Sequence, residues 1–403
     1  MTRLYLKKGR DESLRRFHPW VFSGAIGGIE GPDPAEGDAV EVYSTQKDFL
    51  GWGHYQIGSI AVRMLSFADD MPAGGPDVAF WTRRLQACLD ARRAFSLAGA
   101  SNTTCYRLVH GEGDFLPGLI VDWYDGCCVL QAHSVGMFRA LPQLTEALRA
   151  VYGPALKAVY DKSSGTAPFK AGLDLADGYL WQAPGQSLLC PRTVLENGHS
   201  FLVDWENGQK TGFFLDQRDN RARVESYASG RRVLNLFCYT GGFSVYALAG
   251  GAVSVDSVDS SARAIEMAGR NVELNFGPDA PHRALCTDAI DFVKQAEPGD
   301  YDLMIVDPPA FAKHRGALAG ALRAYQRLNA AAISSVAPGG LVFTFSCSQV
   351  VDREAFALAV FSAAADARRE VRILDRVGQG ADHPVNIFHP EGSYLKGLVL
   401  YVE

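Results

Sequence analysis

The sequence contains neither a long uninterrupted apolar run nor cysteines at the spacing of metal ligands. No stretch reaches the roughly 18 consecutive apolar residues that a membrane-spanning helix needs. The N-terminus, MTRLYLKKGRDESLRR, also lacks the apolar segment of a secretory signal. The eight cysteines are scattered without a CxxC pair, which indicates neither a zinc site nor a disulfide framework. We therefore expect a cytoplasmic protein with reduced thiols and no metal.

Positive charge is in short supply over the chain as a whole. The formal net charge of -6 argues against binding nucleic acid through a global positive field. The first twenty residues are locally basic, since only Asp11 and Glu12 oppose Arg3, Lys7, Lys8, Arg10, Arg15 and Arg16. Such a face either contacts phosphates or is an ordinary solvated surface, and the sequence alone leaves both open.

The chain of 403 residues is long enough to form more than one hydrophobic core. Three kinds of sequence pattern follow one another along it. Residues 1–72 show short alternating runs broken by Gly, Pro and Asp, which predict a small β-barrel. Residues 73–190 mix helical and strand-like segments and predict a central α+β domain. Residues 191–403 alternate buried strands with helices, which predicts a doubly wound, Rossmann-like α/β sheet.

A glycine turn follows the first strand of this last region. The strand VLNLF (233–237) runs into CYTGGFSVYALAGGA, where Gly241 and Gly242 let the backbone turn tightly at the head of a helix. Ligands of open α/β sheets bind beyond the carboxyl ends of the strands, where this turn lies. The turn has neither the GxGxxG spacing of a dinucleotide site nor the Lys-Ser/Thr of a phosphate loop, so a nucleotide phosphate is not the expected ligand.

Three acids are predicted at the ends of the following strands. Asp259 ends AVSVDSVD, about twenty residues beyond the turn, where a carboxylate can accept hydrogen bonds from both ribose hydroxyls; Asp256 is close enough to be confused with it. Asp288 ends the next strand and Asp307 the fourth, before two prolines that fix the backbone. Each acid alone could be a helix cap, but together with the glycine turn they predict a binding site.

A thiol lies at the end of the fifth predicted strand, GGLVFTFSCS, where Cys347 is expected beside Asp307. Methylation of a pyrimidine carbon needs such a sulfur, because cytosine C5 becomes nucleophilic only after a thiolate adds to C6. Taken alone, a cysteine is more often a buried structural residue. A reactive thiol needs an electropositive setting, for which the candidates are Lys313, His314, Arg315 and His383.

These features resemble the class I S-adenosylmethionine methyltransferases. The blocks QKTGFFLDQRDNR (209–221), DPPAFAKHR (307–315), SCS (346–348) and ADHPVNIFHPEGSYLKG (381–397) resemble, more specifically, the RlmI-type enzymes that make 5-methylcytosine in large-subunit ribosomal RNA. KKGRDESLRRFHPWVFSGAI resembles the start of a PUA domain, and RLVHGEGDFLPGLIVDWYDG resembles the family's central domain. The resemblance therefore spans essentially the whole chain.

The resemblance implies a function, a cofactor, a partner and site residues. S-adenosylmethionine would be the cofactor, 23S ribosomal RNA the substrate and a homodimer the assembly. Cys347 would be the nucleophile, and Asp307 would hydrogen-bond the N3/N4 edge of cytosine. The implied cofactor contacts or their scaffolding are Phe237, Tyr239, Thr240, Gly241, Gly242, Asp259, Asp288, Asp307, Lys210, Asp216 and Arg218.

The N-terminal module is the predicted RNA-binding part. Looped RNA is read through stacking and phosphate contacts, for which the expected residues are Lys7, Lys8, Arg15, Arg16 and His18, with Phe17 and Trp20 as exposed aromatics. Trp20 and Phe22 are equally compatible with a place in the core.

Two other functions remain open at this point. The first is a methyltransferase that acts on a guanine or adenine nitrogen, since DPP followed by an aromatic residue also suits exocyclic amines. The second is an RNA-binding ribosome-assembly factor with a silent catalytic domain, although the glycines, the three acids and the thiol are all present. His383 and Lys396 stay outside the predicted catalytic set, since a lone histidine after Asp more often makes a structural hydrogen bond.

Overall fold

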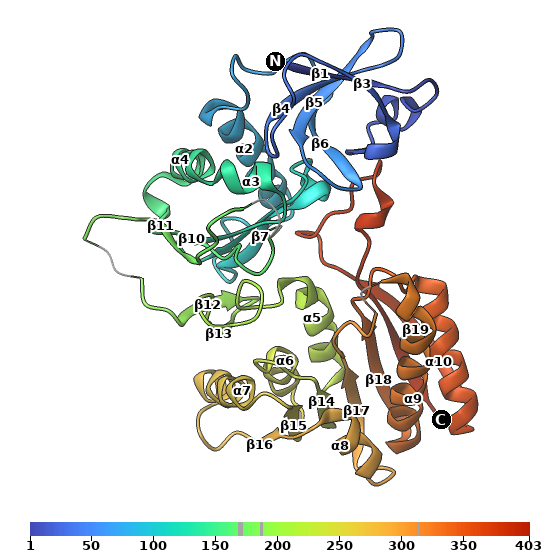
Figure 1. Ribbon diagram of the computed structural model, residues 1–403. Coiled ribbons are helices and arrows are strands. Elements are labelled where there is room, and N and C mark those ends of the chain that lie inside the picture. The colour runs from blue at the N-terminus through green and yellow to red at the C-terminus, as the bar shows by residue number, and fades with distance from the viewer. Residues whose placement is uncertain (168–171, 186–187, 313) are drawn as a thin grey trace. The chain divides into compact units, whose positions relative to one another are not determined.

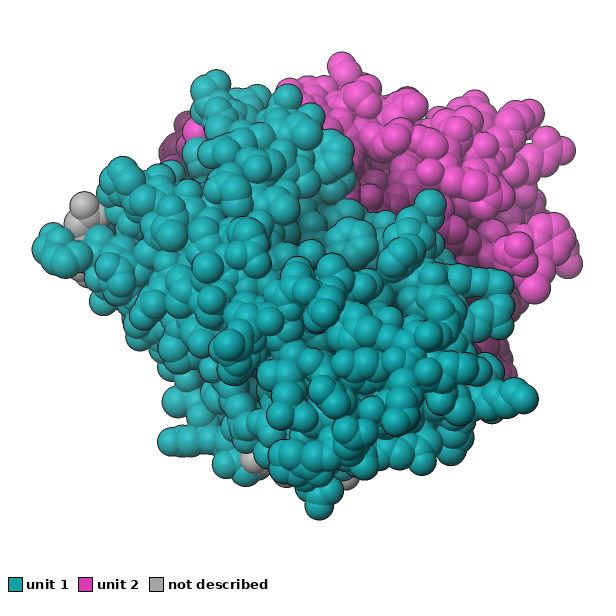
Figure 2. All heavy atoms as spheres, turned by 90° about the horizontal axis from the view of Figure 1, so that it is seen from above, with its two compact units in different colours: residues 1–194, 203–213, 381–392 teal, residues 195–202, 214–380, 393–403 magenta. Residues whose placement is uncertain are grey.

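The computed structural model describes residues 1–167, 172–185, 188–312 and 314–403. The chain forms two compact units, which Figure 2 distinguishes by colour. Residues 1–194, 203–213 and 381–392 make up the first unit, and residues 195–202, 214–380 and 393–403 make up the second. Because residues 381–392 belong to the first unit, these units divide the chain differently from the three predicted domains, and that three-domain division stays a prediction.

The N-terminal part of the first unit is a six-stranded sheet in the order β2-β6-β5-β4-β1-β3 (Figure 1). Its elements are β1 (Thr2–Leu6), α1 (Glu12–Arg15), β2 (Trp20–Phe22), η1 (Ser23–Ala25), β3 (Ile26–Glu30), β4 (Ala39–Tyr43), β5 (Phe49–Tyr55) and β6 (Ile60–Ser66). Burial alternates along β1 and β4, so Leu4, Leu6, Val40 and Val42 fill one core while the intervening residues face outward. This is the all-β module that the sequence predicts for the N-terminus.

The rest of the first unit is a five-stranded sheet in the order β11-β10-β9-β8-β7, with helices packed on it. Its elements are α2 (Val78–Ala94), β7 (Cys105–His110), η2 (Gly111–Asp114), β8 (Leu119–Tyr124), β9 (Cys127–Ala132), α3 (Val135–Arg139), α4 (Leu141–Tyr152), η3 (Gly153–Ala155), β10 (Ala158–Asp161) and β11 (Gly178–Gln182). Asp77 caps α2 by accepting the backbone N–H of Phe80. A hairpin of β12 (Arg192–Glu196) and β13 (His199–Val203) follows.

The second unit is a seven-stranded sheet in the order β16-β15-β14-β17-β18-β20-β19 (Figure 1). Its elements are η5 (Leu215–Gln217), α5 (Arg218–Tyr227), β14 (Arg232–Leu236), α6 (Gly242–Ala249), β15 (Ser254–Asp259), α7 (Ala262–Phe276), β16 (His282–Cys286), α8 (Ala289–Gln295), β17 (Tyr301–Val306), η6 (Arg315–Ala317), α9 (Leu318–Ser335), β18 (Val336–Ser346), α10 (Arg353–Ala367), β19 (Val371–Gly378) and β20 (Lys396–Val402). Helices α5, α6 and α7 cover one face, and α8, α9 and α10 cover the other. The predicted doubly wound, Rossmann-like sheet is thus confirmed.

The sequence pattern missed one strand of this sheet. The five strands from β16 to β18 are parallel, but β20 lies antiparallel between β18 and β19. The last strand of the chain therefore separates two strands that precede it. The apolar run KGLVLYV is compatible with a buried strand, but its direction and its neighbours depend on pairing with distant residues and cannot be read from the run itself.

Within the part of the chain that the structure describes, no helix combines the length and apolar character that a membrane crossing requires.

Candidate active site

The predicted site residues gather at one edge of the second unit's sheet. The parallel register aligns Leu236 with Val258 and Val306, and Val306 with Thr344, so the carboxyl ends of β14, β15, β17 and β18 lie side by side. The segments that follow these strands carry the glycine turn, Asp259, Asp307 and Cys347. The sheet thus brings together residues that lie more than one hundred positions apart in the sequence.

The glycine turn after β14 is built from left-handed backbone. Phe237, Tyr239 and Gly241 all have positive φ, at 57°, 47° and 77°. A Cβ atom on Gly241 would lie only 2.9 Å from the Cβ of Ala268, so both the conformation and the close approach of α7 require glycine there. The amide of Asn271 fixes the turn by donating to the carbonyl of Thr240 at 2.8 Å. Helix α6 begins at Gly242, and its first backbone N–H groups lie at this turn.

The structure separates Asp259 from Asp256. Asp256 is buried within β15 and is occupied by Arg283 and by the hydroxyl of Tyr301, which donates to it at 2.5 Å. Asp259 lies at the strand end and accepts the backbone N–H groups of Tyr239 at 3.0 Å and Ser261 at 2.9 Å. Two N–H donors orient this partly exposed carboxylate beside the turn, so Asp259 and not Asp256 suits a ligand's hydroxyl groups.

Asp288 follows β16 and has a structural role in addition to its predicted one. Its Oδ1 atom caps α8 by accepting the backbone N–H groups of Ile290 at 2.8 Å and Asp291 at 2.9 Å. The residue is exposed. Contact of Asp288 with adenine remains a prediction.

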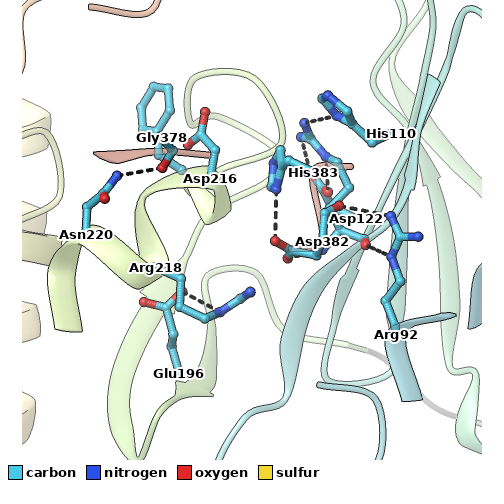
Figure 3. Close-up of polar contacts among 12 residues, drawn as sticks. Arg92, His110, Asp122, Glu196, Asp216, Arg218, Asn220, Gly378, Asp382 and His383 are labelled. Carbon is cyan, nitrogen blue, oxygen red and sulfur yellow. Dashed lines mark hydrogen bonds and ion pairs between the residues drawn. The ribbon is translucent and has the colours of Figure 1, made fainter. Parts of the chain in front are cut away.

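Asp307 is held by a chain of side-chain amides that the sequence reasoning missed. The Nε2 of Gln217 donates to Asp307 Oδ2 at 2.9 Å, and the Oε1 of Gln217 accepts from Asn220 at 2.6 Å. Asn220 in turn donates to the carbonyl of Gly378 at 3.0 Å (Figure 3). Gln217 and Asn220 are almost fully buried, so this chain orients the Asp307 carboxylate from behind. Both amides lie within the block QKTGFFLDQRDNR, which was the available signal.

Asp216 and Arg218, in the same block, are buried parts of the framework. Asp216 accepts the hydroxyl of Tyr394 at 2.5 Å, and Arg218 forms an ion pair with the buried Glu196 at 3.4 Å (Figure 3). These contacts correspond to the scaffolding role that the sequence left open for both residues. Lys210 belongs to the first unit, and its predicted contact with the cofactor stays a prediction.

Cys347 directly follows β18, and Asp307 directly follows the adjacent strand β17. It is partly exposed, and its sulfur is not part of a disulfide bond. The next residue is fixed by two contacts, because the hydroxyl of Ser348 donates to Ala312 O at 2.6 Å and Lys396 donates to Ser348 O at 2.5 Å. Cys238, in the glycine turn, differs, since burial raises the pKa of its thiol well above the usual value and keeps it protonated. Cys347 is therefore better suited to act as a nucleophile.

Four residues were the candidates for an electropositive setting of the Cys347 thiol. Lys313 lies outside the described residues, and His314 and Arg315 are exposed. His383 belongs to the first unit, where it is buried and pairs through Nδ1 with Asp382 at 2.9 Å (Figure 3). This is the structural hydrogen bond that the sequence favoured for it.

The predicted RNA-binding residues lie between β1 and β2 of the first unit, and some of their charges are paired with acidic side chains. Arg15 forms ion pairs with Asp11 and Asp48, and Arg16 forms one with Glu12. Lys7 and Lys8 are exposed, and Lys7 donates to the carbonyl of Gly24. His18 Nδ1 accepts the backbone N–H of Trp20.

The aromatic residues beside this basic group are more exposed than a core position allows. Phe17 and Phe22 are 47% and 50% exposed, so the core interpretation of Phe22 is wrong. Trp20 is half-buried, and its indole N–H donates to Glu112 at 2.9 Å. RNA binding by this group of residues stays a prediction.

One group of possible metal ligands occurs among the described residues of the first unit. His18, His389 and Glu391 offer three ligand atoms that lie within 4.8 Å of one another. The expectation that the protein uses no metal therefore stays a prediction.

Comparisons with known proteins agree with this geometry. A family of S-adenosylmethionine-dependent methyltransferases matches residues 106–379, and a PUA-like domain matches residues 4–67. The ribosomal RNA large subunit methyltransferase I of Photobacterium profundum is 41% identical over 405 residues, with 100% of both chains covered. The protein of the same name from Aeromonas salmonicida is 40% identical over 400 residues, with 98% of both chains covered.

A solved structure extends the comparison to the fold. The structure of SMU.776, described as a methyltransferase complexed with SAH, superposes with a TM-score of 0.83 at 25% sequence identity and covers 100% of both chains. The predicted fold and cofactor are confirmed. The chain belongs to the S-adenosylmethionine-dependent methyltransferases and, within them, to the family of ribosomal RNA large subunit methyltransferase I.

Proposed function

We propose that this protein methylates C5 of a cytosine in 23S ribosomal RNA, through a covalent bond between Cys347 and C6 of the base. The observation that carries the proposal is a partly exposed thiol directly beyond β18, beside β17, the strand that Asp307 follows. Methyl transfer to a ring or exocyclic nitrogen has no need of a thiol at this position. The names of the full-length relatives support large-subunit ribosomal RNA as the substrate.

The residues beside the glycine turn fit an adenosine-containing cofactor. Asp259 has an oriented carboxylate for the two ribose hydroxyls, and Asp288 retains a second carboxylate oxygen beyond the one that caps α8. Gly241 and Gly242 permit close approach of the backbone, and Phe237, Tyr239 and Thr240 line the turn. When bound, S-adenosylmethionine supplies an electrophilic methyl group on a positively charged sulfur.

In this reaction Cys347, beyond β18, is the nucleophile, and Asp307, beyond β17, contacts the base. The thiolate of Cys347 forms a bond to C6, and the electron pair of the C5–C6 double bond moves so that C5 becomes nucleophilic. Asp307, oriented by Gln217, hydrogen-bonds the N3/N4 edge and favours the protonated adduct. Once C5 carries the methyl group, a base removes the C5 proton, the double bond re-forms and the sulfur–C6 bond breaks. Cys347 is thereby returned as a thiolate.

The remaining parts of the proposal concern the RNA and the assembly. The N-terminal part, in which Lys7, Lys8 and Phe17 are exposed, would hold a looped segment of RNA. The target base must leave its stack to reach the thiol. Such a substrate implies a cytoplasmic enzyme, and a homodimer is the assembly that we infer from the family resemblance.

The test is methyl transfer from labelled S-adenosylmethionine to ribosomal RNA from cells that lack the protein, followed by nucleoside analysis. We expect 5-methylcytosine with the wild type and none with Cys347→Ala. Cys286→Ala is the matched control, because Cys286 ends β16 at the edge of the same sheet and is exposed, but has no assigned role. Label on a nitrogen, or an active Cys347→Ala protein, would overturn the thiolate mechanism and leave the methyltransferase assignment intact.

A further inference from the structure

Lys396 is a buried cation at the start of β20. Its side chain belongs to a residue that is only 5% exposed, and its ammonium group donates to the carbonyls of Ser348 and Val351, both at 2.5 Å. These two carbonyls belong to the segment that directly follows Cys347. The pairing of Lys396 with Ser346, the last residue of β18, places the start of β20 beside this segment. An ammonium group therefore lies under the loop that carries the thiol.

Among the residues that the structure describes, no aspartate or glutamate oxygen forms an ion pair with Lys396. Desolvation of a lysine is unfavourable by several kcal/mol, and buried charges are normally paired. Two carbonyls satisfy two of the three N–H donors, but they carry no net charge to balance the cation.

Three ionisable groups act on Lys396 from the surrounding elements. Burial lowers the pKa of Lys396 to about 8, the charge of the Cys347 thiolate raises it, Arg353 lowers it and Asp352 raises it. Asp352 is already committed to the N-terminus of α10, where it accepts the backbone N–H of Ala355 at 2.7 Å. Arg353 has the wrong sign. The remaining group is Cys347, which can become an anion and whose negative charge favours the charged form of Lys396.

We propose that Lys396 is a positioning residue for the methyl transfer, because its buried ammonium group holds the loop of Cys347 and provides the positive charge that stabilises the thiolate. This inference rests on the proposed role of Cys347 as the nucleophile. It gives the thiol the electropositive setting that a reactive cysteine requires. It also explains why a cation is retained at a site where an apolar residue would avoid the desolvation.

The charge and the hydrogen bonds of Lys396 can be separated by substitution. Lys396→Gln keeps amide N–H donors for the two carbonyls but removes the charge, Lys396→Met removes both, and Lys396→Arg keeps both. A lysine that merely supports the loop would be replaced well by glutamine. If Lys396 stabilises the thiolate through its charge, glutamine should not replace it, whereas arginine should replace it at least in part.

The experiment measures the ionisation of Cys347 in the full-length protein, without RNA or cofactor. The rate of alkylation by iodoacetamide is recorded against pH, and the peptide that contains Cys347 is quantified by mass spectrometry. In the wild type we expect a midpoint below the ordinary thiol value of about 8.5. Lys396→Gln and Lys396→Met should raise this midpoint by about one pH unit or more, which makes alkylation near pH 7 roughly tenfold slower. Lys396→Arg should stay close to the wild type.

Alkylation of Cys286 in the same samples is the internal control, since its thiol is exposed and donates to Ser260 O, away from Lys396. Its profile should not change in any variant. A midpoint for Cys347 that stays at the wild-type value in folded Lys396→Gln protein would overturn the inference. If Lys396→Met does not fold, Lys396→Gln still gives the answer. Failure of the proposed function would appear separately, as methyl on another atom, because the alkylation assay involves no methyl transfer.

Discussion

Glu196 provides the most stringent test of how the second unit supports its active-site edge. Its carboxylate is fully buried and accepts from Arg221 Nε and Nη2, each at 2.8 Å, and from the hydroxyl of Tyr246 at 3.0 Å. Arg218 adds an ion pair at 3.4 Å. This cluster joins the hairpin of β12 and β13 to α5 and α6, the helix that begins at the glycine turn. A single carboxylate therefore pairs with two buried guanidinium groups.

Glu196→Gln preserves the shape of the side chain and removes its charge. One oxygen acceptor becomes an NH2 donor that faces the N–H donors of the arginines, so the two buried arginines lose the negative charge of this carboxylate. Breaking a buried ion pair in this way costs about 3–5 kcal/mol. The matched control is Glu12→Gln, because Glu12 pairs with Arg16 on the surface, where the two side chains are 70% and 76% exposed. An exposed pair contributes at most about 1 kcal/mol.

The assay is guanidinium denaturation followed by far-UV circular dichroism, with tryptophan fluorescence recorded in parallel. All six tryptophans belong to the first unit, so their fluorescence monitors that unit while the circular dichroism monitors both. We expect the transition seen by circular dichroism to move to clearly lower denaturant in Glu196→Gln and to stay in place in Glu12→Gln. A loss below about 1 kcal/mol for Glu196→Gln would refute the reasoning, because the arginines would then need no anion.

Three further predictions concern the glycine turn, Asp307 and a buried histidine. Gly241→Ala should weaken S-adenosylmethionine binding at least tenfold in calorimetry, because alanine is strained at a φ of 77°, whereas Gly269→Ala, which faces open space on α7, should not. Gln217→Leu should lower the single-turnover methylation rate about tenfold to a hundredfold with little change in cofactor affinity, since it removes the donor that orients Asp307; an equal loss in both would contradict this. Burial lowers the pKa of His54 from 6.5 to about 4, so the unfolded chain binds a proton between these values that the folded chain does not. The contribution of neutral His54 to the free energy of unfolding is thus fully present above pH 6.5 and is lost, by about 3 kcal/mol, as the pH falls towards 4. Denaturation midpoints measured against pH should therefore fall less steeply in His54→Phe.

The local chemistry of the active-site edge could be predicted from the sequence. Buried strands followed directly by Gly241, Asp259, Asp307 and Cys347 indicate a binding edge, because the carboxyl ends of parallel strands meet at one side of a sheet. The motifs then identify the family without any coordinates. The family and the position of these residues at the strand ends could be predicted because they depend on residues that are neighbours in the chain and on a pairing rule that parallel sheets share.

Where two nearby residues fit the same role, the sequence could not decide between them. Asp256 and Asp259 are equivalent in the sequence, and only the contacts of Arg283 and Tyr301 with Asp256 separate them. The predicted basic face is likewise reduced once Arg15 pairs with Asp48, a residue of another strand connection. Which charges remain available depends on partners that folding brings near.

The sequence by itself determined the class of the fold, the cofactor, the family and the thiol at the strand end, because each is encoded in a short contiguous motif. The tertiary structure alone decided that β20 lies antiparallel beside β18, that Gln217 orients Asp307 and that the ammonium group of Lys396 lies under the loop of Cys347. The physical reason is that a hydrogen bond or an ion pair depends on distance in space. Lys396 and Ser348 are 48 positions apart in the chain, yet their atoms meet at 2.5 Å.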